Sequence, residues 1–279
     1  MFSNSHLHSI YSDGESTPAQ LVDMVKRAGY RALILTDHDT MRGYHLLQLH
    51  ARRARMLTML GCEVTTTGFG SESIHVLAID FDPENEAMRA LMRRGADRQT
   101  KRSEQLFLKG LENGSLREGT TWDEVRSAFP NNDFFCNSQV FDVLVKKGIY
   151  RLEERKEYWN SVFAYHLPAS KELDMVLPSF SDVEEAISTI RRAGGVPMIA
   201  HPHGFEKYAE DMIKMGVLGF ETHHPELDSD DIAFFTELCE ENRLYMSGGT
   251  DHERIYPIES AVGYASEENF MKLYHRELG

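Results

Sequence analysis

Residues 6–39 read HLHSIYSDGESTPAQLVDMVKRAGYRALILTDHD and contain the pattern that decides the fold. An apolar run lies near each end of this stretch, and a helical pattern lies between them. Thr17 is a typical N-cap, Pro18 suits the first helical position, and Gly29 is a typical stop. The stretch therefore predicts a complete strand–helix–strand unit of the kind that builds parallel sheets.

The same alternation continues along the chain. Amphipathic helical patterns follow Thr40 and cover residues 182–192, 205–215 and 229–241, the last with Ser229 as the expected N-cap. Apolar runs that predict strands lie at residues 6–10, 33–36, 57–64, 74–79, 196–200, 217–221 and 244–247. Seven strands with helices between them predict an α/β fold with a mainly parallel sheet, closed or nearly closed into a barrel.

The alternation breaks between residues 82 and 179, where several helical patterns follow one another with little strand signal. We therefore expect a barrel made of residues 1–81 and 180–279, and a helical cap made of residues 82–179. In the cap, Arg98, Lys101 and Arg102 share one helical face and could bind a substrate phosphate. A solvated basic face is the alternative, and we favour phosphate binding because the chain has little other basic surface.

Composition limits the classes of function. The formal net charge of −14 argues against binding of duplex nucleic acid, whereas a small anionic substrate needs only local positive charge. No run approaches the roughly 18 apolar residues of a membrane span, and the N-terminus lacks the features of a secretory signal. Because the three cysteines are few and scattered, we expect reduced thiols and a cytoplasmic location.

Potential metal ligands occur at the ends of most predicted strands. His6 and His8 lie two residues apart on a strand, so both rings can point to the same face and reach one metal. This pair alone is a weak signal, but side chains at the carboxyl ends of barrel strands converge. The other candidates are Asp13, Asp37, His38, Asp39, Glu63, His75, His201, Asp251 and His252. Nitrogen and carboxylate donors without a thiolate suit Mn, Zn or Fe.

These residues also form motifs that resemble those of the PHP (polymerase and histidinol phosphatase) family of metal-dependent phosphoesterases. The motifs are His6-x-His8, Tyr11-Ser12-Asp13-Gly14, Thr36-Asp37-His38-Asp39, Gly61-x-Glu63, Ile199-Ala200-His201-Pro202 and Gly249-Thr250-Asp251-His252. The resemblance spans both parts of the expected barrel and carries less weight in the cap. It implies a distorted seven-stranded barrel, in agreement with the seven runs.

The resemblance also implies two or three divalent ions and a set of ligands. One ion would be held by His6, His8, Glu63 and Asp251; a second by Glu63, His75 and His201; a third by Asp13 and His38. Two features depart from the family pattern. Many members have Asp-x-His where this chain has adjacent Asp251 and His252, so the direction of His252 decides whether it is a ligand. The segment around His223 is unusually rich in histidine, and His223 could be a ligand, a phosphate contact or a structural residue.

The predicted reaction is hydrolysis of a small phosphate ester, a nucleotide or a sugar phosphate, by a metal-bound hydroxide. His203 or a metal-bound water could protonate the leaving oxygen, and Asp37 could orient a ligand. Asp39 could do the same, or could cap the following helix. The alternatives are a cyclic phosphodiesterase that then cleaves the monoester, and hydrolysis of amides or carboxylate esters. A non-catalytic barrel is disfavoured because the ligand set is complete.

Overall fold

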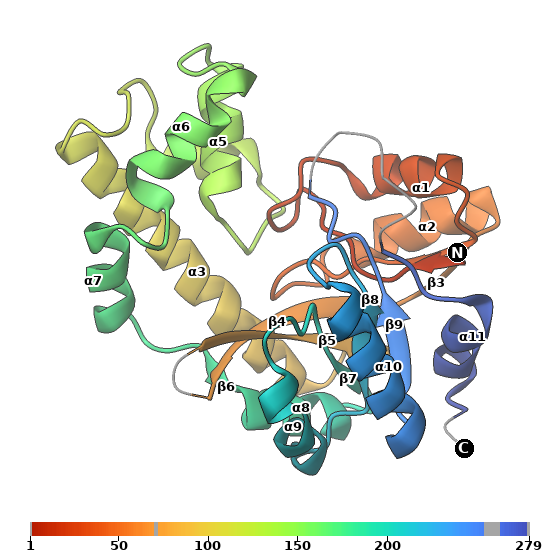
Figure 1. Ribbon diagram of the computed structural model, residues 1–279. Coiled ribbons are helices and arrows are strands. Elements are labelled where there is room, and N and C mark those ends of the chain that lie inside the picture. The colour runs from red at the N-terminus through yellow and green to blue at the C-terminus, as the bar shows by residue number, and fades with distance from the viewer. Residues whose placement is uncertain (1, 70–71, 254–262, 278–279) are drawn as a thin grey trace.

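The computed structural model describes residues 2–69, 72–253 and 263–277 and contains two β-sheets. The smaller sheet is parallel and has the order β1 (Ser3–Asn4), β2 (Ala32–Ile34), β3 (Leu57–Met59). The larger sheet has the order β6 (Ser181–Asp182), β4 (Gly61–Gly68), β5 (Glu72–Ile79), β7 (Val196–Ile199), β8 (Gly219–His223), β9 (Tyr245–Gly248). Figure 1 shows the larger sheet at the centre of the molecule, with α1, α2 and the smaller sheet beside it.

The expected α/β class is confirmed, but the expected closed barrel is not formed by the described residues. The larger sheet is mixed, because β5 runs antiparallel to both of its neighbours, β4 and β7. The predicted strand 57–64 is interrupted at Leu60, and its two parts, β3 and β4, belong to different sheets. Residues 6–10 form no regular strand. The sheets are linked instead by isolated bridges such as Leu7–His252 and His38–Glu63.

Most helices begin and end near the predicted residues. In α1 (Pro18–Arg27), Thr17 is the N-cap and forms a capping box with Gln20. The other predicted helices are α2 (Tyr44–Ala54), α8 (Val183–Arg192), α9 (Ala209–Met215) and α10 (Ser229–Asn242). Two predicted caps are wrong. Asp228 caps α10 in place of Ser229, and α2 begins too late for Asp39 to cap it.

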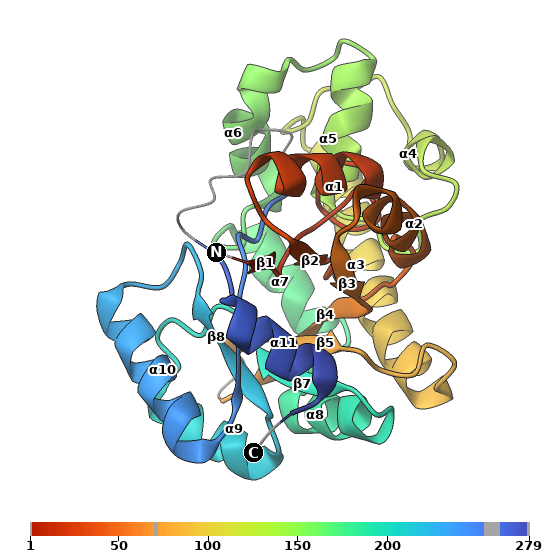
Figure 2. The ribbon, with the colours of Figure 1, turned by 90° about the vertical axis from the view of Figure 1, so that its right-hand side faces the viewer.

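One face of the larger sheet carries the main apolar core. Ile187 of α8, Met212 of α9 and Phe235 of α10 are fully buried against Val64 and Val76 of the sheet. Figure 2 shows these helices along the lower part of the molecule, and α11 (Glu267–His275) packs beside β9. Burying these apolar side chains fixes the strands, and with them the residues at the strand ends.

The segment between β5 and β6 is helical, as expected. It contains α3 (Glu86–Glu112), α4 (Trp122–Ala128), α5 (Asn137–Lys146), α6 (Arg155–Tyr158) and α7 (Pro168–Val176). These helices have their own core, which includes the fully buried Phe107 and Phe141. The helix α3 belongs to both parts, since Met88 near its start packs in the main core. Across the described ranges, no helix is both long and apolar enough to cross a membrane.

Short polar contacts fix the helical segment beside the strand ends. The hydroxyl of Thr40 donates to Asp133 (2.9 Å), and the Asn132 amide donates to the Ile10 carbonyl (2.6 Å). Arg155 pairs with Glu15 in the loop before α1. In α3, Gly95 lies directly against Asp39, and a Cβ atom at Gly95 would lie 2.3 Å from the Asp39 carboxyl carbon.

The close approach of α3 to Asp39 makes Gly95→Ala informative. Alanine normally stabilises a helix interior by about 1 kcal/mol relative to glycine. Here we expect the opposite sign, a loss of about 1–3 kcal/mol in unfolding free energy, because the methyl group overpacks the contact. Urea unfolding of the variant, with Gln99→Ala on the same helix as control, measures this. A stabilised Gly95→Ala variant would contradict the packing described.

Candidate functional site

The carboxylate of Glu63 is the centre of a cluster of histidines. It lies on β4, is 1% exposed, and its Oε1 lies 3.0 Å from Nδ1 of His75 and 3.2 Å from Nε2 of His201. Its Oε2 lies 3.2 Å from one ring nitrogen each of His6, His8 and His38. The His38–Glu63 bridge brings the ends of two sheets together at this point. One buried carboxylate is therefore in reach of five imidazoles.

The imidazoles form a continuous ring of side chains. Neighbouring ring centroids lie 4.6 to 5.6 Å apart in the order His6, His8, His38, His75, His201, His224. These histidines come from segments far apart in the sequence, as predicted from their positions at strand ends. Close packing of uncharged rings does not by itself indicate a ligand. The carboxylates around the rings therefore decide what the cluster can bind.

Two aspartates complete the cluster. Asp251 Oδ1 lies 2.9 Å from Nε2 of His8 and 3.5 Å from Nε2 of His6. Asp13 lies 3.3 Å from both His8 and His38, one oxygen to each ring. The backbone at Asp251 has a φ of 49°, and that at His201 a φ of 29°. Non-glycine residues rarely adopt such positive values, which occur preferentially at functional sites.

The carboxylates and the histidines of the cluster shift each other's pKa values. Burial opposes protonation of His38, but the carboxylates of Asp13 and Glu63 outweigh it and raise the His38 pKa to about 9. Likewise, burial alone would raise the pKa of Glu63, but His6, His38 and His75 hold it well below its ordinary value. The cluster therefore favours ionised carboxylates together with positive charge at His6, His8 and His38, whereas burial lowers the pKa of His75.

Several buried polar atoms in this cluster lack a hydrogen-bond partner among the described residues. They include Glu63 Oε2, His38 Nδ1, His224 Nε2 and Glu221 Oε1. Although ring nitrogens lie 3.2 Å from Glu63 Oε2, none is oriented to donate to it. Groups of three or four ligand atoms lie within 4.8 Å of one another around Glu63. Imidazole nitrogens and carboxylate oxygens in this arrangement fit divalent cations.

Two residues of the cluster, Glu221 and His224, are missing from the predicted set. Glu221 Oε2 lies 3.0 Å from Nδ1 of His6 and accepts the backbone N–H of His201 at 2.9 Å. Glu221 ends a predicted strand, so the same strand-end argument could have identified it. His224 lies beside Asp251, whereas His223, the predicted candidate, contacts Thr222 and the ring of Tyr264. A β-bulge between Glu221 and His223 shifts the alternation of side chains.

His252 is in none of the ligand groups found among the described residues. It is paired with Leu7 in a parallel bridge, and bridge partners point to the same side. Leu7 is fully buried in an apolar core, on the side opposite to its neighbours His6 and His8. The geometry therefore separates His252 from the ligands that flank Leu7.

Asp37 and Asp39 have different surroundings. Asp37 accepts hydrogen bonds from the Ser9 backbone (2.6 Å), the Ser9 hydroxyl (2.7 Å) and the Ser12 hydroxyl (2.7 Å). It therefore fixes the loop that carries Asp13. Asp39 turns away from the cluster with a φ of 51°, and burial raises its pKa to about 7.

The remaining candidates lie outside the cluster. His203 is 59% exposed and its Nδ1 lies 2.7 Å from Asp231. Arg98 and Arg102 both donate to the carboxylate of Asp174, which joins α3 to α7. Lys101 is exposed. The two arginines are thus engaged within the helical segment.

The chain was compared with known proteins. The model of the PHP domain matches residues 4–167, which confirms the resemblance found in the motifs. A phosphoribosyl 1,2-cyclic phosphate 1,2-diphosphodiesterase of Eggerthella lenta is 24% identical, over 95% of this chain and 98% of the relative. A 3′,5′-nucleoside bisphosphate phosphatase of Chromobacterium violaceum is 25% identical, over 88% and 85%. A 5′-3′ exoribonuclease of Haemophilus influenzae is 26% identical, over 71% and 67%.

The fold also has a close match among solved structures. A protein of Bifidobacterium adolescentis, assigned as a metal-dependent phosphoesterase, superposes with a TM-score of 0.83 at 22% identity, covering 100% of this chain and 97% of that one. The two chains therefore share their fold along the whole length, including the helical segment.

The pKa of His38 predicts how the stability of the metal-free protein depends on pH. An unfolded histidine has a pKa of about 6.5. Since the folded value is raised to about 9, the stabilisation is complete below pH 6.5 and is lost as pH rises through 9. The rise of the His38 pKa from about 6.5 to about 9 sets an upper limit of about 3 kcal/mol on this stabilisation.

Urea unfolding of chelator-treated protein at pH 6.5 and 9 measures this loss. The variant His38→Gln cannot titrate at this position, so its unfolding free energy should change less across the same interval. A metal-free protein that becomes more stable from pH 6.5 to 9 would show that the charge assignment is wrong.

Proposed function

The chain belongs to the PHP domain family, and we propose that it is a metal-dependent hydrolase of small phosphate esters. One observation carries the proposal. The two oxygens of the buried Glu63 carboxylate face two separate groups of histidines, and Oε2 accepts no hydrogen bond from those around it. A single carboxylate with ligands on both sides is suited to bridging two cations.

We assign the ligands from these contacts. His6, His8 and Asp251 would hold one ion on the Oε2 side of Glu63, and His75 and His201 would hold the other on the Oε1 side. When bound, divalent ions lower the pKa of water and neutralise the charge of phosphoryl oxygens. Mn, Zn and Fe all suit such donors.

Neighbouring residues orient these ligands. The Glu221 carboxylate accepts from Nδ1 of His6, which leaves Nε2 of His6 directed at the cluster. Asp37 plays a positioning role through Ser9 and Ser12. His203, whose Nδ1 is held by Asp231, has an exposed ring that can deliver a proton to a leaving oxygen from Nε2.

Glu253 is a further ligand candidate, for a third ion. Glu253 is in none of the groups of described residues whose ligand atoms lie within 4.8 Å of one another, but its carboxylate lies close enough to Asp13, Asp251 and His38 for their charges to act on it. Burial, together with the negative charges of Asp13 and Asp251, raises the pKa of Glu253 to about 8. A cation bound by Asp13, His38 and Glu253 would relieve this repulsion.

The relatives support phosphate esters as substrates and differ in the kind of ester. The Chromobacterium relative is named for nucleoside bisphosphates, in line with our leading proposal of a nucleotide or sugar phosphate. The Eggerthella relative is named for a cyclic phosphate and supports a cyclic phosphodiesterase as the alternative. Because another relative is an exoribonuclease, short RNA belongs among the substrates to test. We propose a cytoplasmic enzyme, in which Cys62, Cys136 and Cys239 are free and buried.

Phosphate release by the manganese-loaded protein tests the function. The substrates are nucleoside monophosphates and bisphosphates, sugar phosphates, cyclic phosphates and short RNA. We expect Glu63→Gln to lower turnover at least about 100-fold, because even residues that only orient metal ligands change activity 10- to 100-fold. His50→Ala on α2 is the control and should leave turnover unchanged. Tight metal binding together with hydrolysis of carboxylate esters or amides alone would contradict the proposal.

Metal analysis distinguishes Glu253 from its neighbour His252. Under saturating Mn we expect three ions per chain in the wild type, two in Glu253→Gln and three in His252→Ala. Elemental analysis after gel filtration gives these numbers, and circular dichroism checks that both variants fold. Loss of an ion in His252→Ala, or none in Glu253→Gln, would reverse the assignment.

A further inference from the structure

Two aromatic side chains of the helical segment are exposed although their neighbours are buried. Trp159 is 37% exposed and Tyr165 is 59% exposed, whereas the adjacent Tyr158 and the intervening Phe163 are buried in the core of the segment. The ring centroids of Trp159 and Tyr165 lie 6.4 Å apart, and the ring planes are inclined by 59°. Figure 1 shows the segment that joins α6 to α7 beside α3. Two large rings in contact with solvent and with each other form a surface that a ligand can cover.

The ring of Tyr165 is held from one side. The guanidinium of Arg102 lies over the ring, with Cζ 4.5 Å from the centroid. Arg102 is itself buried and donates to both oxygens of Asp174, at 2.8 and 3.1 Å. Because this pair fixes the arginine, one face of the Tyr165 ring is covered and the other face is open to solvent. The ring is therefore presented as a flat surface in a defined orientation.

Tyr165 also lies near the proposed metal site. Although much of its ring is exposed, burial raises the pKa of its hydroxyl, Arg102 opposes this rise, and the negative charge of Asp13 adds to it. Asp13 lies 3.3 Å from His8 and from His38 and is a proposed ligand of the third ion. Tyr165 is thus open to solvent and within reach of the charge of a metal ligand. It is placed to contact the part of a substrate that extends away from the metals.

The chemistry of this surface distinguishes between the two substrates of the leading proposal. A sugar phosphate is recognised mainly by hydrogen bonds to its hydroxyl groups, whereas the base of a nucleotide presents a flat π-face. Proteins bind bases of any sequence by stacking them on exposed aromatic side chains, and a neighbouring arginine adds a cation–π contribution. Tyr165, with Arg102 behind it and Trp159 at an angle to it, is a surface of this kind.

We propose that Tyr165 makes the enzyme prefer nucleotides to sugar phosphates, by stacking on the nucleobase while the phosphate lies at the metals. This inference rests on the proposed phosphoesterase function. Trp159 borders the stacked base along one edge. Tyr165 does not touch the reacting phosphorus, so its role is in specificity and not in the chemical step.

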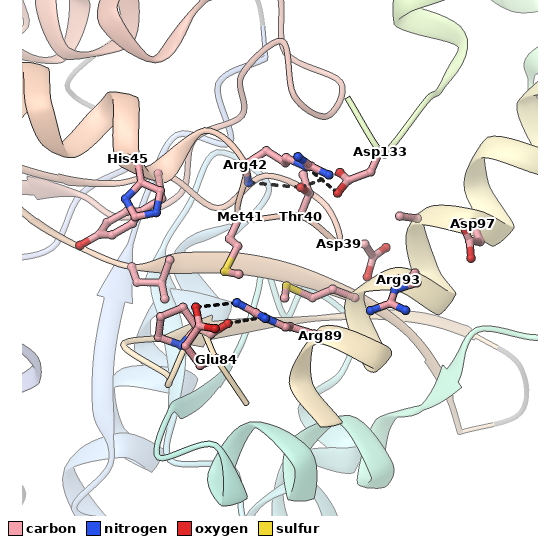
Figure 3. Close-up of a pocket in the computed structure, with 15 residues that line it drawn as sticks. Asp39, Thr40, Met41, Arg42, His45, Glu84, Arg89, Arg93, Asp97 and Asp133 are labelled. Carbon is pink, nitrogen blue, oxygen red and sulfur yellow. Dashed lines mark hydrogen bonds and ion pairs between the residues drawn. The ribbon is translucent and has the colours of Figure 1, made fainter. Parts of the chain in front are cut away.

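The pocket shown in Figure 3 is a different place. It has a volume of about 700 Å³, and its lining includes Asp39, Arg93 and Asp133. Among the described residues, neither of the two exposed aromatic residues and none of the assigned metal ligands lines it. Arg93→Ala therefore serves as a control variant that changes this pocket and not the aromatic surface.

Steady-state kinetics of the manganese-loaded protein with AMP and ribose 5-phosphate test the inference, because these substrates share the 5-phosphate and differ in the base. We expect a higher kcat/KM for AMP in the wild type. Tyr165→Ala should lower kcat/KM for AMP at least about fivefold, mainly through KM, and leave that for ribose 5-phosphate within about twofold. Tyr165→Phe, which keeps the aromatic face, should retain the preference. Arg93→Ala and Tyr274→Ala, the latter at a tyrosine of α11 that is 38% exposed, should match the wild type.

Equal kcat/KM for both substrates in the wild type, or an equal loss for both in Tyr165→Ala, would overturn the inference. Hydrolysis of neither substrate would count against the proposed function. Stacking is then decided by calorimetric titration with the methylenephosphonate analogue of AMP, which resists hydrolysis. A dissociation constant at least about fivefold larger in Tyr165→Ala than in Tyr165→Phe supports stacking, and equal constants or no binding contradict it. Circular dichroism and metal analysis check that the variants fold and keep their ions.

Discussion

The buried carboxylate of Glu63 is the constraint around which the site is organised. Five histidines lie within 3.2 Å of its two oxygens, and the surrounding charges keep it ionised despite burial. An ionised group in a dry interior is costly unless opposite charge compensates it. Protonated histidines supply that charge in the metal-free protein, and we propose that cations supply it in the working enzyme. Glu63 thus takes part in the stability of the fold, in the pH dependence of that stability and in the proposed metal chemistry.

The architecture follows from the need to bring distant segments to this carboxylate. The two sheets do not close into a barrel but meet through isolated bridges at His38–Glu63 and Leu7–His252, next to the ligands. Regular ladders at these points would direct side chains by strict alternation. The positive φ values at Asp39, His201 and Asp251 instead turn side chains individually. The helical segment is fastened at the same edge, through Asp133 to Thr40 and Arg155 to Glu15.

The sequence predicted the parts of this arrangement that depend on local signals. The helix α1, its Thr17 cap and the gathering of His6, His8, Glu63, His75 and His201 follow from periodicity and from strand ends. The sequence did not predict where the regular alternation of side chains along a strand is interrupted. The bulge in β8 exchanges the roles of His223 and His224, and the break at Leu60 separates one predicted strand into two sheets. Such irregularities arise from tertiary packing, which periodicity does not contain.

Charge patterns in the helical segment were also ambiguous from sequence alone. Arg98 and Arg102 share a helical face, as predicted, but Asp174, more than 70 residues away, engages both. Arg93, which no pattern singled out, lines the pocket of Figure 3 and makes no hydrogen bond or ion pair with another described residue. Which basic residues remain available for a ligand depends on contacts between distant segments.

A crystal structure of the manganese-loaded protein, with anomalous scattering recorded at the manganese edge, tests the central claim most directly. The account predicts ions on both sides of Glu63, one bonded to Oε1 together with His75 and His201, and one bonded to Oε2 together with His6, His8 and Asp251. A protein that binds manganese elsewhere, with Glu63 bonded to none, would contradict it.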